Sequence, residues 1–376
     1  MNTSNWPKWN QVDWPTTLFL TLTPLVGLIG TGFAIWIEGF SWGMASFSLI
    51  FAALTNLSIT AGYHRLYSHR SYVAHPIAQW ILVFIGTSAW QSSVLKWCTD
   101  HRQHHSEVDT DADPYSINKG FWYAHLGWMF WKSPEDFKIN CPDLEKSAFL
   151  RFQHNHYIKC AIAVGFLLPL AVGWAFGYPL TGLFMAGALR IGLTQQSTFF
   201  VNSLCHTMGK QTYSNQITAR DSLFVAFLTH GEGYHNFHHK FQFDYRNGIR
   251  WWQWDPTKWT IETLKIVGLA TRLRTVSQTE ILKARLHMES AKLKSKGYSA
   301  EKLEALKSQV LLAQVRLKKL KEDYTRLKVE YRRLKAHSHE SIEHMKTEMT
   351  LAKLEFQFAL KQWKALLKSP VAVQLS

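Results

Sequence analysis

Two uncharged stretches of 21 residues, separated by only three positions, constrain the fold of this chain more than any other feature. They cover residues 17–37 and 41–61, and the residues between them are Glu38, Gly39 and Phe40. A helix needs about 20 apolar residues to cross a bilayer core of about 30 Å. Because the connection is so short, the two stretches predict a hairpin of membrane-spanning helices.

A second pair of apolar stretches, 160–178 and 180–203, predicts a second hairpin. Its last stretch contains Arg190 and the pair Gln195-Gln196, which we expect to face the interior of the bundle. Neither hairpin tip contains Lys or Arg, whereas residues 62–158 contain nine. Since basic residues accumulate on the cytoplasmic side, we expect both termini and the middle segment to be cytoplasmic. The membrane is a bacterial inner membrane or the endoplasmic reticulum.

The formal net charge of +15 belongs mostly to the end of the chain. Residues 277–376 contain 21 Lys and Arg against 11 Asp and Glu, a net charge of +10. The apolar body excludes an ordinary soluble nucleic-acid-binding protein, so we expect no nucleic-acid partner. We divide the chain into an interfacial segment at 1–16, which carries Trp6, Trp9 and Trp14, a membrane domain at 17–276 and a basic tail at 277–376.

The tail has apolar residues in steps of three and four from Leu303 to Leu334, the heptad seam of a coiled coil. The segment from His337 to Glu340 interrupts this seam, and a further helix is predicted over about 341–368. We expect the tail to self-associate, which would make the chain a homo-oligomer, or to dock a partner. An intramolecular hairpin and contact with anionic lipid are the alternatives.

Histidines are concentrated in the apolar body. Eight of them form three clusters: His64 and His69; His101, His104 and His105; and His235, His238 and His239. Positions i, i+3 and i+4 lie on one face of a helix, so each His-x-x-His-His cluster presents three imidazoles together. The pair His64 and His69 is five residues apart. These two converge only if the helix ends or bulges between them, or if they approach a metal from its side.

A ninth candidate ligand is His206, with Asn202 four residues earlier on the same helical face. A structural zinc site uses four ligands, so eight or nine histidines predict two metal ions. Imidazole binds iron, zinc and copper, and a shell of neutral imidazoles favours bridging oxygen ligands and oxygen-activating chemistry. All three clusters must lie on one side of the membrane to share a site. We therefore interpret the uncharged residues 76–95 as an interfacial or re-entrant segment and not as a span.

These features together predict an all-α integral membrane protein. It has four transmembrane helices, a cytoplasmic histidine-rich cap that holds two metal ions, and a C-terminal helical tail of the coiled-coil type.

Three segments carry a resemblance to a known family: GYHRLYSHRSY at 62–72, WCTDHRQHH at 97–105 and GEGYHNFHH at 231–239. Together with Asn202 and His206, they resemble the histidine boxes of the membrane acyl-CoA Δ9 desaturases of the stearoyl-CoA type, over about residues 15–265. The resemblance implies two iron ions that use O2 and two electrons to form a cis double bond in a saturated acyl chain. An unactivated C–H bond offers no acidic proton, so a redox centre is required rather than a catalytic acid or base.

The resemblance also implies how the ligands are divided. One metal would be held by the residues matching His64, His69, His101, His105 and His238. The other would be held by those matching His104, His206, His235 and His239, with Asn202 acting through a water. Trp97, Asp100, Lys132 and Phe199 match substrate-contact positions of the family.

This sequence departs from the family pattern at three positions. Thr99 stands where an Arg is typical, Ser92 where an Asn is typical, and Phe199 where a Trp is typical. A Lys at position 132 binds phosphate as a point charge without the bidentate fork of Arg. The acyl carrier therefore stays open between coenzyme A, a membrane lipid and acyl carrier protein. We expect electrons from a separate donor, a ferredoxin or cytochrome b5 with its reductase.

Two other functions compete with desaturation. A related membrane di-iron enzyme would insert a hydroxyl group into the acyl chain, and the histidine boxes alone do not separate these reactions. A non-catalytic zinc scaffold would need only four ligands. The soluble carboxylate di-iron desaturases are disfavoured because they need two Glu-x-x-His pairs, and only Glu232 with His235 has that spacing.

Overall fold

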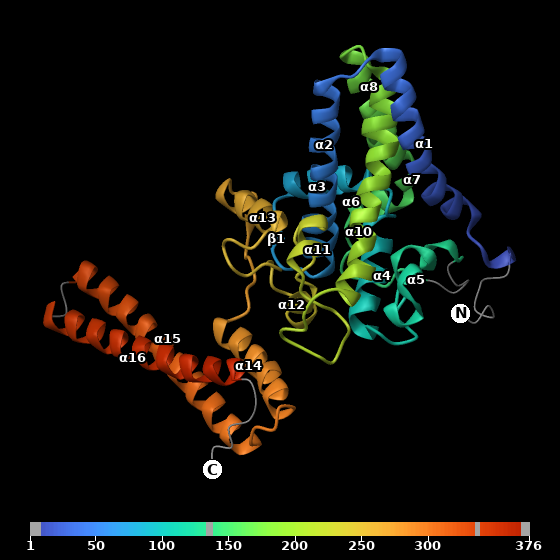
Figure 1. Ribbon diagram of the computed structural model, residues 1–376. Coiled ribbons are helices and arrows are strands. Elements are labelled where there is room, and N and C mark those ends of the chain that lie inside the picture. The colour runs from blue at the N-terminus through green and yellow to red at the C-terminus, as the bar shows by residue number, and fades with distance from the viewer. Residues whose placement is uncertain (1–8, 133–137, 335–338, 370–376) are drawn as a thin grey trace. The chain divides into compact units, whose positions relative to one another are not determined.

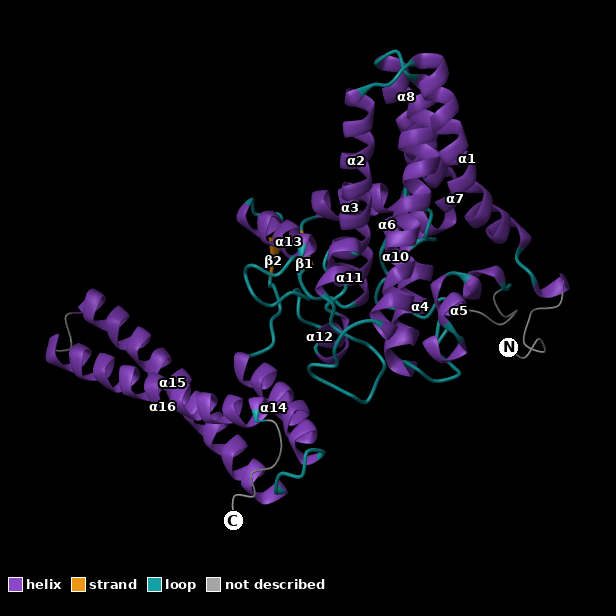
Figure 2. Cartoon of the chain, viewed as in Figure 1, coloured by secondary structure: helices purple, strands orange, loops and turns teal. Residues whose placement is uncertain are grey.

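The computed structural model describes residues 9–132, 138–334 and 339–369. The chain divides into two compact units, one formed by residues up to 211 with 216–275 and the other by 276–376 with 212–215. Helices dominate both units, and the strands that the described residues form are two short segments (Figure 2). Trp6, part of the predicted interfacial segment, lies outside the described residues.

The first hairpin forms as the uncharged stretches predict. Its helices are α1 (Trp14–Glu38) and α2 (Trp42–Leu57), and α2 continues into the π-helix η3 (Ser58–Ser68). Asp13 begins α1 by accepting a hydrogen bond from the Thr16 amide, and Gly39 ends it with a φ of 80°. Only glycine adopts such a φ without strain. Both helical runs are long and apolar enough to cross a membrane.

The second hairpin packs beside the first (Figure 1). Its first arm runs from Tyr157 to Ala175 through α7 (Tyr157–Ile162), η6 (Ala163–Leu167) and α8 (Leu168–Ala175). Its second arm runs through α9 (Pro179–Thr181), η7 (Gly182–Leu189) and α10 (Arg190–Thr207). Among the described helices, only three stretches meet the length and hydropathy of a membrane span, and the second arm is not one of them. Arg190 and the two glutamines lower its hydropathy.

The polar residues of this second arm face inward, which confirms the expectation for them. Arg190 is 2% exposed and donates hydrogen bonds to the carbonyls of Ala186, Ser88 and Gly165. Gln195 is also buried and donates to the Trp90 carbonyl. The polar groups that would be costly in lipid are thus satisfied inside the bundle.

A carboxylate joins the two hairpins at their tips. Glu38 accepts hydrogen bonds from the backbone amides of Leu180 and Thr181, at 2.7 and 2.9 Å. These amides belong to the first turn of a helix, which has no intrahelical acceptors for them. The acid at one hairpin tip therefore caps the helix that begins at the other.

The stretch 76–95 contains α3 (Pro76–Thr87), whose 12 residues reach about 18 Å at 1.5 Å per residue. This helix is too short to cross a core of about 30 Å. Just before α3, β1 (Val73–Ala74) pairs antiparallel with β2 (Ala270–Thr271). The segment therefore lies against the cap of the first unit, as the shared histidine site requires.

Short helices build the rest of the cap. They are η2 (Trp9–Gln11), α4 (Val94–Glu107), η4 (Ile117–Lys119), α5 (Phe121–His125), η5 (Gly127–Phe130), α6 (Ala148–Asn155), α11 (Leu223–Leu228), α12 (His235–Lys240) and α13 (Pro256–Ile266). A buried cluster that includes Tyr63, Leu82, Leu95 and Ile261 ties η3, α3, α4 and α13 together. This cluster holds η3 and α4, two of the elements that carry the histidines.

The tail forms α14 (Gln278–Lys294), α15 (Ala300–Leu334) and α16 (His339–Lys368). Leu303 and Val310, two residues of the predicted seam, are 1% exposed and share a buried cluster with Trp363 of α16. The Trp363 indole donates a 2.7 Å hydrogen bond to Glu289 of α14. The seam is therefore used within the chain, as in the hairpin alternative, and self-association stays a prediction. His337 and Ser338, expected to interrupt the seam, lie outside the described residues.

A close contact between α1 and η7 yields a test of the bundle. A methyl group on Gly27 would collide with the backbone of Ala188 and Leu189, whereas no described atom lies within 4 Å of the same position on Gly32. We expect Gly27→Ala to destabilise the protein by about 1–3 kcal/mol through overpacking. Gly32→Ala is the matched control, and its melting temperature in detergent should equal or exceed that of the wild type. Equal melting temperatures for both variants would contradict this helix contact.

Candidate metal centre

Four elements bring the nine histidines together. The residues His64 and His69 come from η3 and its end, the second cluster from α4, His206 from α10 and the third cluster from α12. The nitrogens form two groups, within each of which all ligand atoms lie within 4.8 Å of one another. One group is His64, His69, His101, His105 and His238, and the other is His104, His206, His235 and His239.

The π-helical winding of η3 resolves the five-residue spacing of its histidines. The amide of His69 donates to the carbonyl of His64 at 3.1 Å, an i to i+5 hydrogen bond. This winding brings residues five apart onto nearly the same face, and the two imidazole ring centroids are 4.7 Å apart. The helix also ends at His69, so both conditions for convergence are met.

The i, i+3, i+4 spacing splits each of the other two clusters between the groups. On α4, His101 and His105 belong to the five-histidine group, and His104 belongs to the four-histidine group. The rings of His105 and His239, one from each group, stack with centroids 4.2 Å apart. The two groups are therefore adjacent and share a wall of imidazoles.

The separations between the Nε2 atoms fit metal ligands. Within the five-histidine group, His69 and His101 are 2.9 Å apart, and His64 and His238 are 3.0 Å apart. In the other group, His235 and His239 are 3.0 Å apart. Two nitrogens that each bind one metal at about 2.1 Å and at right angles are about 3.0 Å apart. Several lone pairs that converge in this way are suited to a cation, so the arrangement fits a metal centre.

Burial keeps several of these imidazoles neutral. It lowers the pKa of His235, His238 and His239 well below the ordinary value, and the neighbouring histidines lower it further. Neutral imidazole is the form that binds a metal. These three histidines, which come from both groups, are therefore prepared as ligands at neutral pH.

The opposite ring nitrogens contact oxygen atoms in several cases. The Nδ1 atom of His64 lies 3.0 Å from Glu232, and that of His104 lies 2.9 Å from Asp113. The corresponding atom of His206 lies 2.7 Å from the Thr218 hydroxyl. Burial alone would raise the pKa of Glu232, but its contacts with His64 and Arg65 outweigh burial and lower that pKa well below its ordinary value. Carboxylates at Nδ1 commonly orient histidine ligands.

Sequence reasoning gave these two carboxylates no role at the site. The sequence marks Glu232 only as half of a Glu-x-x-His pair, and it gives Asp113 no role. Glu232 contacts His64, which is far away in the chain, and Asp113 contacts His104, which is nine residues away. No helical spacing predicts either contact. The only signal in the sequence was that each acid stands a few residues before or after a histidine cluster.

A cavity of about 860 Å³ reaches the five-histidine group, since its lining includes His64 and His101. All five other residues singled out from the sequence line the same cavity: Trp97, Asp100, Lys132, Phe199 and Asn202. Trp97 stacks on His101 with ring centroids 4.8 Å apart. Asp100 pairs with Lys96 at 2.7 Å, and Lys132 donates to the Asn10 carbonyl at 2.7 Å.

The departures from the family pattern have different surroundings. Ser92 lines the cavity. Thr99 is 5% exposed and is not among the described lining residues; its hydroxyl donates to the Leu95 carbonyl and accepts from the Asn140 amide. The hydroxyl of Thr99 therefore links α4 to the backbone at Asn140.

A sequence model of the fatty acid desaturase family matches residues 40–264, which include all nine histidines. This chain belongs to the fatty acid desaturase family. Acyl-CoA desaturase 1 of Saccharomyces cerevisiae is 43% identical over 254 residues, which are 66% of this chain and 50% of that protein. A probable acyl-CoA desaturase of Schizosaccharomyces pombe is 38% identical over 282 residues, 74% of this chain and 58% of that protein.

A relative with a different named substrate is similar to the same degree. The sn-1 stearoyl-lipid 9-desaturase of Anabaena variabilis is 38% identical over 268 residues, 70% of this chain and 94% of that protein. The chain spans little more than half the length of the two yeast relatives, and the family match ends before the tail.

The two groups predict a measurable metal stoichiometry. We expect the purified protein, loaded anaerobically with Fe(II), to retain two metal ions per chain. His104→Ala should retain about one, because it removes a ligand from the four-histidine group alone. His287→Ala, at an exposed histidine of the tail, is the control and should retain two. Elemental analysis by mass spectrometry measures the ratio, and two ions in His104→Ala would contradict the grouping.

Proposed function

We propose that this chain is an O2-dependent acyl desaturase that introduces a cis double bond at the Δ9 position of a saturated acyl chain during unsaturated fatty acid biosynthesis. The observation that carries the proposal is the cavity whose wall contains ligands of a two-group histidine centre. A desaturase needs this combination, because a long apolar chain must reach an oxidising centre. The relatives named acyl-CoA and stearoyl-lipid 9-desaturases support the reaction.

The metal pair is two iron ions, held by the five-histidine and four-histidine groups, with Asn202 contributing through a water. When bound, this pair supplies the oxidising chemistry that unactivated C–H bonds require. The residues of the chain provide the ligands, the position of the substrate and protection from water. No side chain is needed as a catalytic acid or base.

Apolar residues around the cavity hold the acyl chain and exclude water. The apolar lining includes Phe19, Leu20, Ile59 and Phe199. Trp97 also lines the cavity and stacks on the ring of His101. Burying each CH2 group of a substrate contributes about 0.8 kcal/mol. Contacts along its whole length therefore hold the acyl chain in the cavity. The position of the acyl carbons relative to the histidines determines where the double bond forms.

Lysine residues on the same cavity are the groups that would contact an anionic headgroup. The lining includes Lys96, Lys119 and Lys132, together with the carboxylates of Asp13, Asp100, Asp111, Asp113 and Glu232. Acyl-CoA, with its phosphates, is the substrate we propose, and an acyl lipid or an acyl carrier protein thioester is the alternative. Lysine binds phosphate as a point charge, so this arrangement accepts more than one headgroup geometry.

The proposed topology has four spans, with the helical run from Pro179 to Thr207 as the fourth. Its polar residues are buried in the bundle, so its low mean hydropathy does not prevent it from spanning the membrane. Both termini and the histidine centre are cytoplasmic. A separate donor, a ferredoxin or cytochrome b5 with its reductase, supplies the electrons there.

Desaturation is tested by the fatty-acid profile of cells that lack their own aerobic desaturase and express this chain. We expect new cis-monoenes that require air and disappear in His104→Ala, measured by gas chromatography–mass spectrometry. The position of the double bond gives the regiochemistry. Hydroxylated chains would overturn desaturation in favour of the hydroxylase, and unchanged lipids after co-expression of an electron donor would favour the zinc scaffold.

The acyl carrier is tested with purified enzyme, an electron donor and either stearoyl-CoA or stearoyl-phospholipid. We expect stearoyl-CoA to be converted, and Lys132→Ala to raise its KM up to about fivefold while kcat changes little, because an exposed charge contact contributes up to about 1 kcal/mol. Lys138→Ala, whose residue is not among the described cavity lining, is the matched control. If only the phospholipid is converted, the substrate is an acyl lipid and not acyl-CoA.

A further inference from the structure

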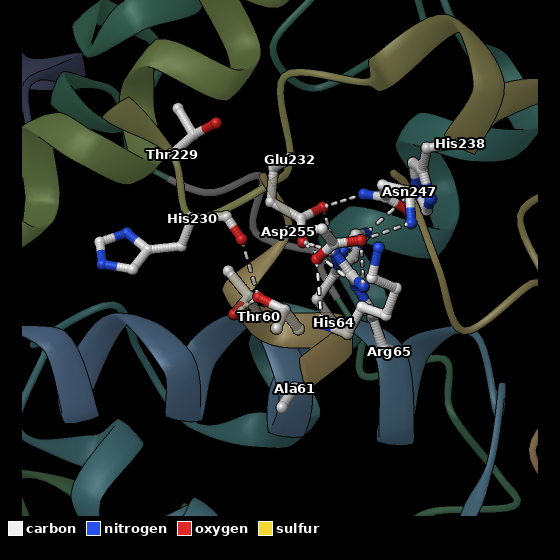
Figure 3. A network of polar contacts seen from close by, with 12 residues as sticks. Thr60, Ala61, His64, Arg65, Thr229, His230, Glu232, His238, Asn247 and Asp255 are labelled. Carbon is white, nitrogen blue, oxygen red and sulfur yellow. Dashed lines mark hydrogen bonds and ion pairs between the residues drawn. The ribbon is translucent and has the colours of Figure 1, made fainter. Parts of the chain in front are cut away.

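Glu232 connects a histidine of the five-histidine group to a buried arginine (Figure 3). One of its carboxylate oxygens lies 3.0 Å from Nδ1 of His64 and accepts a 2.7 Å hydrogen bond from Asn247. The other oxygen accepts a 2.8 Å hydrogen bond from Arg65. Glu232 is 3% exposed and Arg65 is 1% exposed, so this contact is shielded from water.

A second carboxylate holds the arginine from its other side. Asp255 is 0% exposed and bonds Arg65 at 3.0 and 3.1 Å. Asp255 also accepts from the backbone amides of Asn247, Gly248 and Lys258. Because every contact is buried, the Arg65 guanidinium has one orientation, and the carboxylate of Glu232 is held in turn.

This arrangement dictates which nitrogen of His64 carries the hydrogen. An ionised carboxylate only accepts hydrogen bonds, so the ring hydrogen must lie on Nδ1, facing Glu232. The lone pair of Nε2 then points toward the other nitrogens of the group, with His238 at 3.0 Å. The ligand nitrogen of His64 is therefore available only because the opposite nitrogen faces an acid.

We propose that Glu232 is a positioning residue for the five-histidine metal, which it serves by holding His64 in the ligating tautomer and orientation, and that Arg65 and Asp255 hold Glu232 in place. The inference rests on the proposed function, because it requires a metal in that group. It assigns a role to three buried charged residues outside the nine histidines.

The four-histidine group contains a counterpart. Asp113 is 1% exposed and lies 2.9 Å from Nδ1 of His104. Backbone amides of Asp109 and Tyr115 hold it, at 3.1 Å each. Each group thus has a histidine whose Nδ1 lies within about 3 Å of a carboxylate, and the two carboxylates are held by different means. This correspondence supplies a matched pair of substitutions.

Glu232→Gln changes the tautomer preference without changing the shape. The amide has one oxygen and one NH2 group where the carboxylate has two oxygens. A buried arginine without an acceptor is costly, so the amide oxygen should face Arg65 and the NH2 group should face His64. That NH2 group donates to a bare Nδ1, which favours the tautomer whose Nε2 carries hydrogen and cannot bind a metal.

The experiment measures metal retention by the full chain in lipid nanodiscs, loaded with Fe(II) anaerobically and dialysed against a graded chelator. We expect Glu232→Gln to lower the affinity of one of two metals about 10- to 100-fold, so that the ratio falls from about two to about one. Asp113→Asn should lose the other metal, and the double variant should lose both. The absorption spectrum of the Co(II)-loaded proteins should differ between the two single variants.

Asp255→Asn is the control for a purely structural effect, because it disturbs the same network and, among the described residues, bonds no histidine. It should lower the melting temperature and weaken the five-histidine metal less than Glu232→Gln does, because Glu232 keeps its own contact with His64. If Glu232→Gln does not fold, Asn247→Ser loosens the same carboxylate oxygen and should lower the affinity less, for the same metal.

Two metals retained by Glu232→Gln at wild-type affinity would overturn the inference. So would an equal or larger loss of metal affinity in Asp255→Asn, which would make the effect structural. A wild type that binds no metal would overturn the proposed function and this inference with it, whereas a defect confined to the variants leaves the proposed function intact.

Discussion

The convergence of nine imidazole nitrogens is the constraint on which the rest of this unit depends. Neutral nitrogens about 3 Å apart with their lone pairs directed toward each other repel unless a cation lies between them. Four separate elements must therefore be held together by other means. The two helical hairpins, the buried cluster around η3 and the capping of one hairpin by Glu38 provide that rigidity.

Much of this architecture was predictable from the sequence because it follows from regular periods. Uncharged runs gave the first hairpin, and the i, i+3, i+4 spacing gave one-sided histidine clusters on α4 and α12. The inward orientation of Arg190 followed from the cost of charge in lipid. Each of these inferences needs only the local chain and its solvent.

The remaining features depend on contacts between distant segments. The sequence allowed His64 and His69 to converge by a bulge or by a helix end, and the structure has a π-helix that ends there. The roles of Glu232 and Asp113 arise from tertiary contacts, which no local period encodes. The second arm of the second hairpin has too low a mean hydropathy to be recognised as a membrane span. Its polar residues form hydrogen bonds inside the bundle, and mean hydropathy does not take such bonds into account.

The stacked rings of His105 and His239 have a consequence for how the centre assembles. Each ring belongs to a different group, and their centroids are 4.2 Å apart. Because each ring packs on the other, the position of either ring constrains the position of its neighbour. The two groups are therefore assembled around a shared pair of rings and not as two separate sites.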